Sequence, residues 1–391
     1  MSPETVKRLS PLELMSRLIS FPTVSRDSNL PLIDWVENYL NSHGITSHRW
    51  PDPNQPEKAA LFAHVGPDVE GAVVLSGHTD VVPIDGQPWD SDPWEVVQKD
   101  GKYYGRGTCD MKGFDALAIW ALVEAHYEQV TRPLQLALSF DEEVGCTGAP
   151  PMIEAMRGLV PKGSAVIVGE PSMLKAVTGH KGGNAFSTHV IGFEVHSSIH
   201  YQGVSAIHEG ARLIHWATEQ NELNRSATPG PLAAMFDPPY TTWHVGRVSG
   251  GTADNITAKD CHFNMFYRAV PGDEPAILDQ MYSDKVSEIK AAMQVVRPET
   301  DIVLERRFSV PPLKPEEAGE SESLVRNITG DNASHVVSYG TEAGQFQAAG
   351  YSAVVCGPGD IAQAHQPNEF IEVVQFEAGH QFMRDLLKKL K

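Results

Sequence analysis

Four short apolar runs recur along the chain, and each ends at glycine or at polar residues. They cover residues 71–77, 134–140, 165–168 and 353–356. Each run is apolar nearly throughout, which is typical of a strand buried on both faces of an α/β sheet. The pattern therefore predicts at least four core strands, with reactive residues placed directly after them.

Helical periodicity occupies much of the sequence around these runs. Apolar residues recur at helical spacing within residues 11–42, with a break at Phe21-Pro22-Thr23, and residues 115–125 are apolar on most helical faces. Strands that alternate with helices favour an α/β fold, in which helices flank a mixed sheet. Because domains usually have about 100–200 residues, we expect two domains in this chain.

The stretch from residue 181 to residue 308 follows a different pattern. Its segments suggest a small α+β sandwich inserted into the larger domain. The larger domain would then comprise residues 1–180 and 309–391. The predicted strands of the insertion cover residues 186–192, 241–248 and 261–270, and its predicted helices cover residues 205–221 and 274–293.

Charge and composition exclude some classes of partner. The chain has 31 Lys and Arg against 50 Asp and Glu, a formal charge of −19, which disfavours nucleic acid and anionic membranes. No uncharged apolar run reaches the roughly 18 residues of a membrane span, and Met1–Thr5 lacks the start of a signal peptide. The widely spaced cysteines fit a reducing, cytoplasmic location better than a disulfide framework. They are Cys109, Cys146, Cys261 and Cys356.

Polar residues that can bind a metal follow the predicted strands. His78 and Asp80 come directly after the first run, Asp141-Glu142-Glu143 follows the second, and Glu170 follows the third. In open α/β sheets, ligands bind outside the carboxyl ends of the strands. We therefore expect these side chains to meet at one edge of the sheet.

Two further candidate ligands lie outside the strand ends. Asp110 stands in the glycine-rich stretch Gly105–Gly113, and His365 follows the insertion. Histidine and carboxylate ligands without thiolates suit zinc, and a bridging carboxylate would let this set hold two metals. The set therefore suggests metal-assisted hydrolysis.

Each candidate also has an ordinary structural interpretation. His78 and Asp80 could belong to a solvated loop, and Asp110 could cap the following helix. The acidic triplet could be an exposed turn, and His365 a loop residue. If the triplet is functional, adjacent side chains diverge, so one of Glu142 and Glu143 would bind metal and the other would act as general base.

Five of the motifs that carry these candidate residues occur along the chain in the order found in one known family. Together they resemble the dinuclear zinc aminoacylase/carboxypeptidase family, which includes succinyl-diaminopimelate desuccinylase and acetylornithine deacetylase. The resemblance covers nearly the whole chain. It rests on Ser76–Pro83, Gly105–Gly113, Asp141–Gly145, Gly169–Pro171 and Ala364–Pro367, while Gly107–Phe114, Tyr339–Phe346 and Cys356–Gly359 resemble the acetylornithine deacetylase subgroup.

The resemblance implies a dinuclear metallopeptidase-like catalytic domain and divides its ligands between two metals that share Asp110. His78 and Glu170 would complete one site, and Glu143 and His365 the other. The implied metals are two divalent ions, zinc with cobalt as a possible substitute. The resemblance also implies a cis peptide between Asp110 and Met111, an uncommon bond outside proline.

The same resemblance implies three catalytic roles. Glu142 would be general base and then general acid, and Asp80 would orient His78. His196 would stabilise the oxyanion in a neighbouring subunit, because in this family the inserted lid domain also forms a homodimer. Glu194, two residues before His196, is charged where the family commonly has a small residue.

Candidate substrate-binding residues come from several segments. Asn255 and Arg268 match substrate-binding positions of the family, and Lys181 matches the hinge that enters the insertion. Arg268 could grip an α-carboxylate in bidentate fashion or form an ordinary salt bridge at a strand edge. Thr341 and Glu342 lie in a subgroup motif, and charge complementarity suggests that Glu342 pairs with the δ-ammonium of ornithine.

The implied reaction cleaves the acetyl amide of N2-acetyl-L-ornithine to acetate and L-ornithine, a step of arginine biosynthesis. Within the same family, the alternatives are another N-acyl-amino-acid deacylase, a succinyl-diaminopimelate desuccinylase or a dipeptidase. A different class is a binding protein that keeps the fold without activity. Such a protein would have lost Glu142 or a metal ligand, and this chain retains them all.

Overall fold

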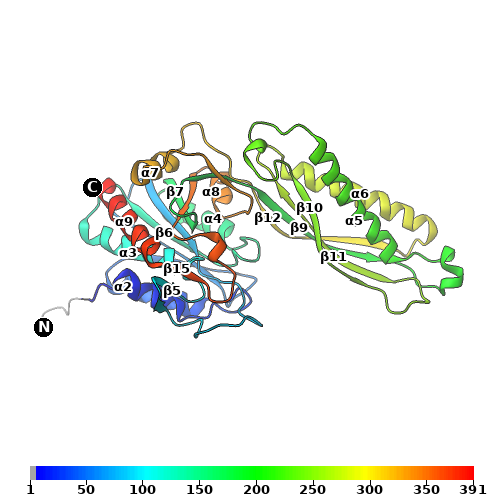
Figure 1. Cartoon of the computed structure of the whole chain (residues 1–391), viewed down its shortest axis with the longest axis horizontal. Coiled ribbons are helices and arrows are strands. Elements are labelled where there is room, and N and C mark those ends of the chain that lie inside the picture. The colour runs from blue at the N-terminus through cyan, green and yellow to red at the C-terminus, as the bar shows by residue number, and fades with distance from the viewer. Residues whose placement is uncertain (1–5) are drawn as a thin grey trace. The chain divides into compact units, whose positions relative to one another are not determined.

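The chain forms two compact units, which are shown in Figure 1. The computed structural model describes residues 6–391, so the Met1–Thr5 segment considered for a signal peptide lies outside the described residues. The first unit comprises the chain up to Gly179 with Leu313–His335 and Thr341–Lys391, and the second comprises His180–Pro312 with Val336–Gly340.

The larger sheet is mixed and has eight strands. Its order is β1-β2-β6-β3-β7-β14-β8-β13. The pairs β6/β3, β3/β7 and β7/β14 are parallel, whereas β1/β2, β2/β6 and β14/β8 are antiparallel. The predicted mixed sheet and its four core strands are therefore confirmed. The bounds are β1 Ser47–Pro51, β2 Ala59–Val65, β3 Ala72–His78, β6 Leu134–Ser139, β7 Gly163–Pro171, β8 Val177–His180, β13 His335–Val337 and β14 Ser352–Gly357.

Helices cover both faces of this sheet. Alternate strand residues such as Leu75 and Leu136 share one hydrophobic core with helices α1, α2, α3, α7 and α9. Helices α4 and α8 contact the other face, and α3 and α9 lie side by side (Figure 1). The bounds are α1 Pro11–Ile19, α2 Leu30–Ser42, α3 Lys112–Glu128, α4 Ala149–Leu159, α7 Glu320–Thr329, α8 Ala343–Ala348 and α9 Val373–Leu390.

A small three-stranded sheet joins two distant parts of the first unit. Its order is β15-β5-β4, and Phe370 of β15 pairs with Tyr104 of β5. The loop that follows β5 carries Asp110, and the segment that precedes β15 carries His365. This sheet therefore brings both loops to the same place. Its bounds are β4 Val97–Lys99, β5 Lys102–Tyr104 and β15 Phe370–Glu372.

The second unit is a two-layer α+β sandwich. Its sheet is antiparallel with the order β10-β11-β9-β12. Helices α5 and α6 cover one face, where Phe263, Met265 and Tyr282 belong to a separate core. The bounds are β9 Gly182–Ile191, β10 Thr242–Gly250, β11 Asp260–Ala269, β12 Asp301–Val310, α5 Ala206–Ser226 and α6 Pro275–Val296. The second unit also has the short 3-10 helices η1 Ser197–Gln202 and η2 Ala233–Met235, and the first unit has η3 Ile361–Gln363.

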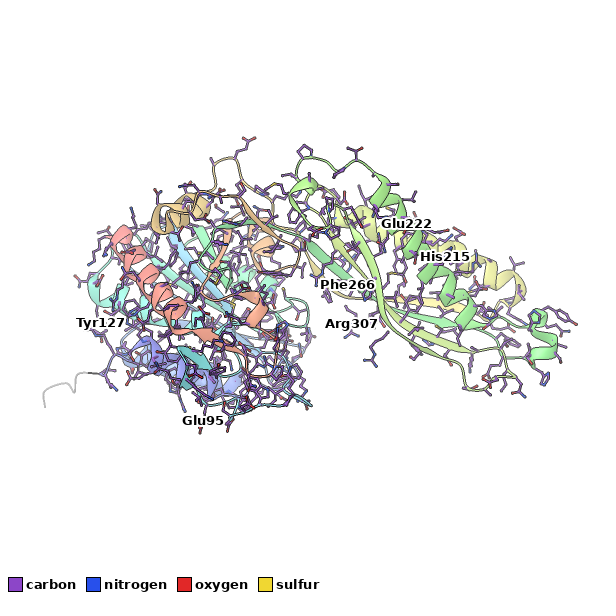
Figure 2. All side chains as sticks on the ribbon, in the orientation of Figure 1. Glu95, Tyr127, His215, Glu222, Phe266 and Arg307 are labelled. Atoms are coloured by element: carbon purple, nitrogen blue, oxygen red, sulfur yellow. The ribbon has the colours of Figure 1, made fainter. Side chains whose placement is uncertain are left out.

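The other face of this sheet carries no helix among the described elements. Along β11, buried residues that face α5 and α6 alternate with more exposed ones such as His262 and Phe266. Figure 2 shows Phe266 away from the labelled His215 and Glu222 of α5. Among residues 6–391, no helix combines the length and apolar composition that crossing a membrane requires.

Candidate metal centre and active site

Neighbouring parallel strands bring most of the predicted ligands together. His78 is the last residue of β3, and it pairs in register with Ser139, the last residue of β6. Glu142 and Glu143 stand three and four residues after the end of β6, and Glu170 lies near the end of β7. Since β6, β3 and β7 are adjacent and parallel, their carboxyl ends share one edge of the sheet.

Asp110 lies between two histidines that come from different parts of the chain. Its Oδ1 is 3.1 Å from Nε2 of His78, and its Oδ2 is 3.1 Å from Nε2 of His365. The peptide bond between Asp110 and Met111 is cis, which confirms that prediction. One carboxylate that presents an oxygen to each of two histidines has the arrangement of a bridging ligand.

Two glutamates extend this arrangement on either side. Glu143 Oε2 lies 3.0 Å from Nε2 of His365, and Glu170 Oε1 lies 3.7 Å from Nε2 of His78. Glu142 Oε2 is also near, 4.0 Å from the same nitrogen of His78. By ligand-atom distance alone, His78 groups with Asp110 and Glu143, and also with Glu142 and Glu170. The groups overlap because all of these side chains converge on one small volume.

The crowding of carboxyl groups changes their proton affinities. Burial, reinforced by repulsion from Asp110, raises the pKa of Glu142 to about 7, that of Glu143 to about 8 and that of Glu170 well above its usual value. Burial also opposes ionisation of Asp110, but hydrogen bonds with His365 and His78 outweigh it and lower the pKa of Asp110. These carboxylates therefore need positive charge in their midst.

Unpartnered oxygens indicate what supplies that charge. Glu143 Oε1 and Glu170 Oε1 are buried without a hydrogen-bond partner among the described residues. Leaving a buried polar atom unpaired is costly, and such atoms commonly mark a ligand or ion site. Oxygen and imidazole donors around one small volume fit divalent metal ions. The residues present therefore fit the metals that the sequence predicts.

Asp80 organises the two ligand segments that follow β3 and β6. Its carboxylate accepts hydrogen bonds from the backbone N–H groups of Glu142, at 3.1 Å, and Glu143, at 3.3 Å. Ser25 Oγ donates to Asp80 Oδ2 at 2.7 Å, and Nδ1 of His78 lies 2.9 Å from the backbone carbonyl oxygen of Asp80. A proton on Nδ1 leaves Nε2 of His78 as the metal-binding nitrogen.

Glu369 holds the Asp110 loop, a role that the sequence did not suggest. Its Oε1 accepts backbone N–H bonds from Gly107, Cys109 and Asp110 at 3.1, 2.9 and 3.1 Å. Arg106 Nη1 donates to its Oε2 at 2.7 Å, and both side chains of this ion pair are about 1% exposed. Glu369 stands four residues after His365, so a glutamate close to a predicted ligand was the available signal.

We expect Glu369→Gln to loosen the bridging ligand. The substitution keeps the shape of the side chain but leaves Arg106 buried without a counter-charge, which costs about 3–5 kcal/mol. Metal affinity should fall by roughly 10–100-fold, as for other residues that support metal ligands. Thermal unfolding and metal titration measure the two effects. The control is Glu95→Gln, at an exposed glutamate labelled in Figure 2, which should change neither the thermal stability nor the metal affinity. Equal behaviour of the two variants would contradict the proposed role of Glu369 in holding the Asp110 loop.

A buried lysine supports the acidic turn after β6. Lys58 forms an ion pair with Asp141 and also donates to the backbone carbonyl of Ser25. Asp141 has a positive φ of 56°, a conformation that few residues other than glycine adopt. The ion pair therefore fixes the turn from which Glu142 and Glu143 project. Lys58 directly precedes β2, in a segment that no sequence motif had connected with the site.

Glu342 and Thr341 lie deeper than substrate contacts would. Glu342 is 1% exposed, Ser139 Oγ donates to its Oε1, and Ser76 Oγ lies 3.4 Å from its Oε2. Thr341 is fully buried, and its Oγ1 accepts the backbone N–H of Ala343 at 3.1 Å. This position differs from the expectation that Glu342 pairs with a substrate ammonium, which requires a carboxylate that the substrate can reach.

The remaining candidates belong to the second unit. His196 and Asn255 lie close together, because Ser197 N–H donates to the carbonyl of Asn255 at 2.8 Å. Arg268 is on β11 with its guanidinium over the Phe266 ring. Lys181 is buried and its Nζ donates to the carbonyls of Pro238 and Tyr240, at 2.6 and 3.1 Å. Burial lowers the pKa of Lys181 to about 8.

Similarity to known proteins agrees with this centre. Residues 74–389 match the profile of the family described as Peptidase family M20/M25/M40. The chain belongs to this family. An acetylornithine deacetylase from Myxococcus xanthus is 35% identical over 370 residues, 92% of each chain, and one from Proteus mirabilis is 33% identical over 387 residues, 96% of each. An M20 family metallo-carboxypeptidase from Sulfolobus solfataricus matches with a TM-score of 0.77 and 15% identity, over 97% of this chain and 99% of that one.

Membership of the M20 family confirms the family expected from the motifs and makes the protein a hydrolase. The fold is confirmed separately, because the M20 carboxypeptidase shares it along nearly the whole chain. M20 proteins are metal-dependent, and the cluster around Asp110 is the candidate metal centre of this one.

Proposed function

We propose that the protein removes the acetyl group from N2-acetyl-L-ornithine and releases acetate and L-ornithine, as a step of arginine biosynthesis. The observation that carries a hydrolytic function is Asp110, which presents one oxygen to His78 and the other to His365. The names of relatives that match over more than 90% of both chains support the acetylornithine substrate.

We further propose that the centre holds two divalent ions, zinc or, in substitution, cobalt. His78, Asp110 and Glu170 would bind one ion, and Asp110, Glu143 and His365 the other. When bound, such ions lower the pKa of a water molecule and polarise the amide carbonyl. Two observations support this assignment: Glu143 Oε1 and Glu170 Oε1 have no hydrogen-bond partner among the described residues, and the pKa values of both glutamates are raised.

Glu142 is the proposed proton carrier. It takes a proton from the attacking water and gives it to the departing amine. Its carboxyl lies beside the ligand cluster, and Cys146 Sγ lies 3.2 Å from its Oε1. The Asp80 carboxylate holds its backbone N–H. Burial raises the pKa of Glu142 to about 7, a value suited to accepting and returning a proton near neutral pH.

His196 is the proposed donor to the oxyanion. Ser198 N–H donates to Nδ1 of His196 at 3.2 Å, so this nitrogen acts as an acceptor. In the neutral imidazole the proton then resides on Nε2, which can donate to a developing negative charge. Arg268 is the proposed partner of the substrate α-carboxylate, and Asn255, beside His196, a further polar contact.

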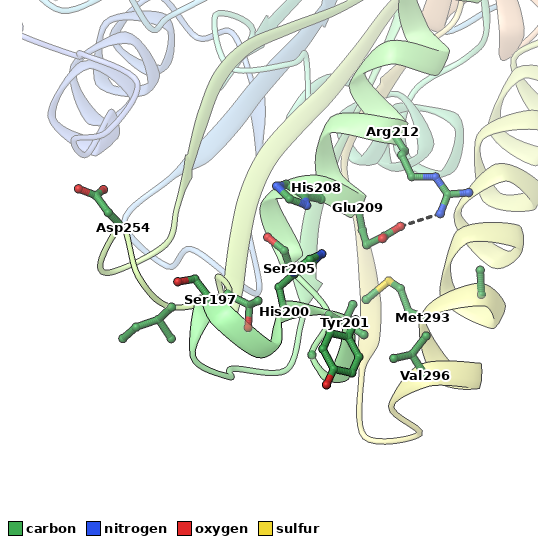
Figure 3. A pocket seen from close by; sticks show the side chains of 15 residues that line it. Ser197, His200, Tyr201, Ser205, His208, Glu209, Arg212, Asp254, Met293 and Val296 are labelled. Carbon is green, nitrogen blue, oxygen red and sulfur yellow. Dashed lines mark hydrogen bonds and ion pairs between the residues drawn. The ribbon is translucent and has the colours of Figure 1, made fainter.

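We also propose a homodimer in which His196 serves the partner subunit's centre. Several exposed apolar side chains near His196 support an interaction surface there, including Tyr201 at 67% and Ile256 at 39% exposure. A cavity of about 500 Å³ lies among them, between η1, α5 and α6 (Figure 3). Buried free cysteines support a cytoplasmic location for this dimer.

Mixing two inactive variants tests the shared site. If Glu142→Ala and His196→Ala chains exchange subunits, half of the dimers are mixed, and each of these has one complete site. Activity should then recover to about one quarter of the wild-type value. A mixture that stays inactive, with exchange demonstrated by differently tagged chains, would contradict sharing but leave the hydrolase assignment intact.

A panel of amides tests the substrate. We expect kcat/KM for N2-acetyl-L-ornithine to exceed that for N-succinyl-diaminopimelate, for a dipeptide and for an uncharged N-acetyl amino acid by at least about tenfold. A site matched to acetylornithine leaves some of its own polar groups unpaired when one of the other substrates binds, and this lowers the rate for that substrate. Chelation should abolish every activity, and added zinc or cobalt should restore it. A preference for a succinyl amide or a dipeptide would replace the proposed substrate by another of the same family.

A further inference from the structure

The uncovered face of the second unit carries a compact cluster of two histidines and an aspartate. His189 of β9 and His262 of β11 are direct cross-strand partners in the antiparallel sheet. Their rings stack with centroids 3.9 Å apart and planes inclined by 19°. Asp260 precedes His262 by two residues, so it points to the same face, and its Oδ1 lies 2.8 Å from Nε2 of His189.

These three side chains offer a chelating set of atoms. One ligand atom from each of His189, Asp260 and His262 lies within 4.8 Å of the other two. Imidazole nitrogens suit zinc, copper and nickel, and two histidines with one carboxylate form a known set of three protein ligands for zinc. We propose that this cluster binds a divalent transition-metal ion of the zinc class, with water at the remaining position.

The backbone already holds these ligands in place. β9 and β11 are the two central strands of the sheet, and they pair continuously from Gly182 to Ile191. The stacked rings must turn about their side-chain torsions to direct a nitrogen of each at one ion, but the backbone needs no reordering, which limits the entropic cost. The side chain of His189 is 31% exposed and that of Asp260 46%, so an ion can reach them from solvent.

Arg247 lines a surface hollow together with His262, but the carboxylate of the cluster is not neutralised by a basic side chain in the part of the chain that the structure describes. Among residues 6–391, no lysine or arginine forms an ion pair with Asp260. Ile191 of β9 lies between Asp260 of β11 and Asp301 of β12 in the sheet. Lys290 forms an ion pair with Asp301 at 2.5 Å, so that lysine already has a partner. A simple imidazole stack with one hydrogen bond is the plainer interpretation. In that interpretation Asp260 pairs with His189 alone, whereas an ion would be bound by all three side chains.

Binding would link the two central strands of the second unit. The site lies in a different unit from the carboxylate cluster around Asp110, and its residues take no part in the proposed hydrolysis. We therefore expect metal binding here to change metal stoichiometry and thermal stability, while the kcat of the metal-loaded enzyme stays the same.

Equilibrium dialysis of the full-length protein against Zn²⁺ tests the site. His262→Gln should bind one equivalent less than the wild type, or bind that equivalent at least about 100-fold more weakly. Asp260→Asn should show a smaller loss, and His244→Gln, at an exposed histidine of the neighbouring β10, should show none. With Co²⁺ as the probe, His262→Gln should lose one visible absorption component.

A second background separates this ion from the catalytic ones. Asp110→Asn should still bind one Zn²⁺ per chain, and adding His262→Gln should remove it. Equal stoichiometry and affinity in wild type and His262→Gln would overturn the proposal, as would an equal loss in the His244→Gln control. Because this readout does not use hydrolysis, failure of the proposed deacetylase activity would not affect it.

Discussion

Asp110→Asn should lose metal from both proposed positions and with it all measurable hydrolysis. Asp110 faces His78 with one oxygen and His365 with the other, so a single substitution affects both ligand groups. Asparagine keeps the size of the side chain, but its amide nitrogen cannot bind a cation. Metal analysis after dialysis, together with kcat/KM for an acetylated amino acid, measures the loss.

The matched control is Asp68→Asn, at an exposed aspartate of the same unit. It should keep wild-type metal content and activity. Circular dichroism of both variants checks that the fold persists. An Asp110→Asn protein that retains two ions and its activity would show that Asp110 does not bridge, and the division of ligands would need to be redrawn.

Glu142→Gln should keep its metals and lose the reaction. The variant retains the shape of the side chain but cannot carry a proton, so kcat should fall by roughly 10²–10⁴-fold. Glu143→Gln offers a contrast at the adjacent residue, because Glu143 contacts His365 and should lose metal as well as activity. Loss of metal by both variants, or by neither, would contradict the assignment of base and ligand.

The pH dependence provides a second readout for Glu142. Burial places its pKa at about 7, and nearby cations would lower that value because they stabilise the carboxylate. A general base must be ionised, so wild-type activity should decline as pH falls through this pKa, in a limb below pH 7. The limb should be absent from the residual rate of Glu142→Gln.

The ligands could be predicted because local sequence determines where they lie. An apolar run that ends in His78, or in the acidic triplet, is already the end of a core strand, and parallel neighbours share an edge. The supporting residues could not be found in this way. Lys58 and Glu369 act through partners 83 and roughly 260 residues away in sequence, and no local pattern links such pairs.

Two other differences have physical causes. β12 escaped prediction because Glu305-Arg306-Arg307 interrupts its apolar residues, which a strand with one uncovered face tolerates. Glu342 was expected to pair with the δ-ammonium of ornithine because of its charge, yet it is buried, and Ser139 and Ser76 provide hydrogen bonds that allow its burial. A charged residue near a predicted site can therefore be buried beneath the site and support it, without contacting the substrate.

The bonds of Glu369 also set an order of events during synthesis. The carboxylate that holds the Asp110 loop comes 259 residues after Asp110 itself, beyond the entire second unit. A growing chain that already contains His78, Asp110, Glu143 and Glu170 still lacks both His365 and this clamp. The complete centre can therefore form only after the whole second unit has been synthesised, because its last ligand and its clamp both follow that unit in sequence.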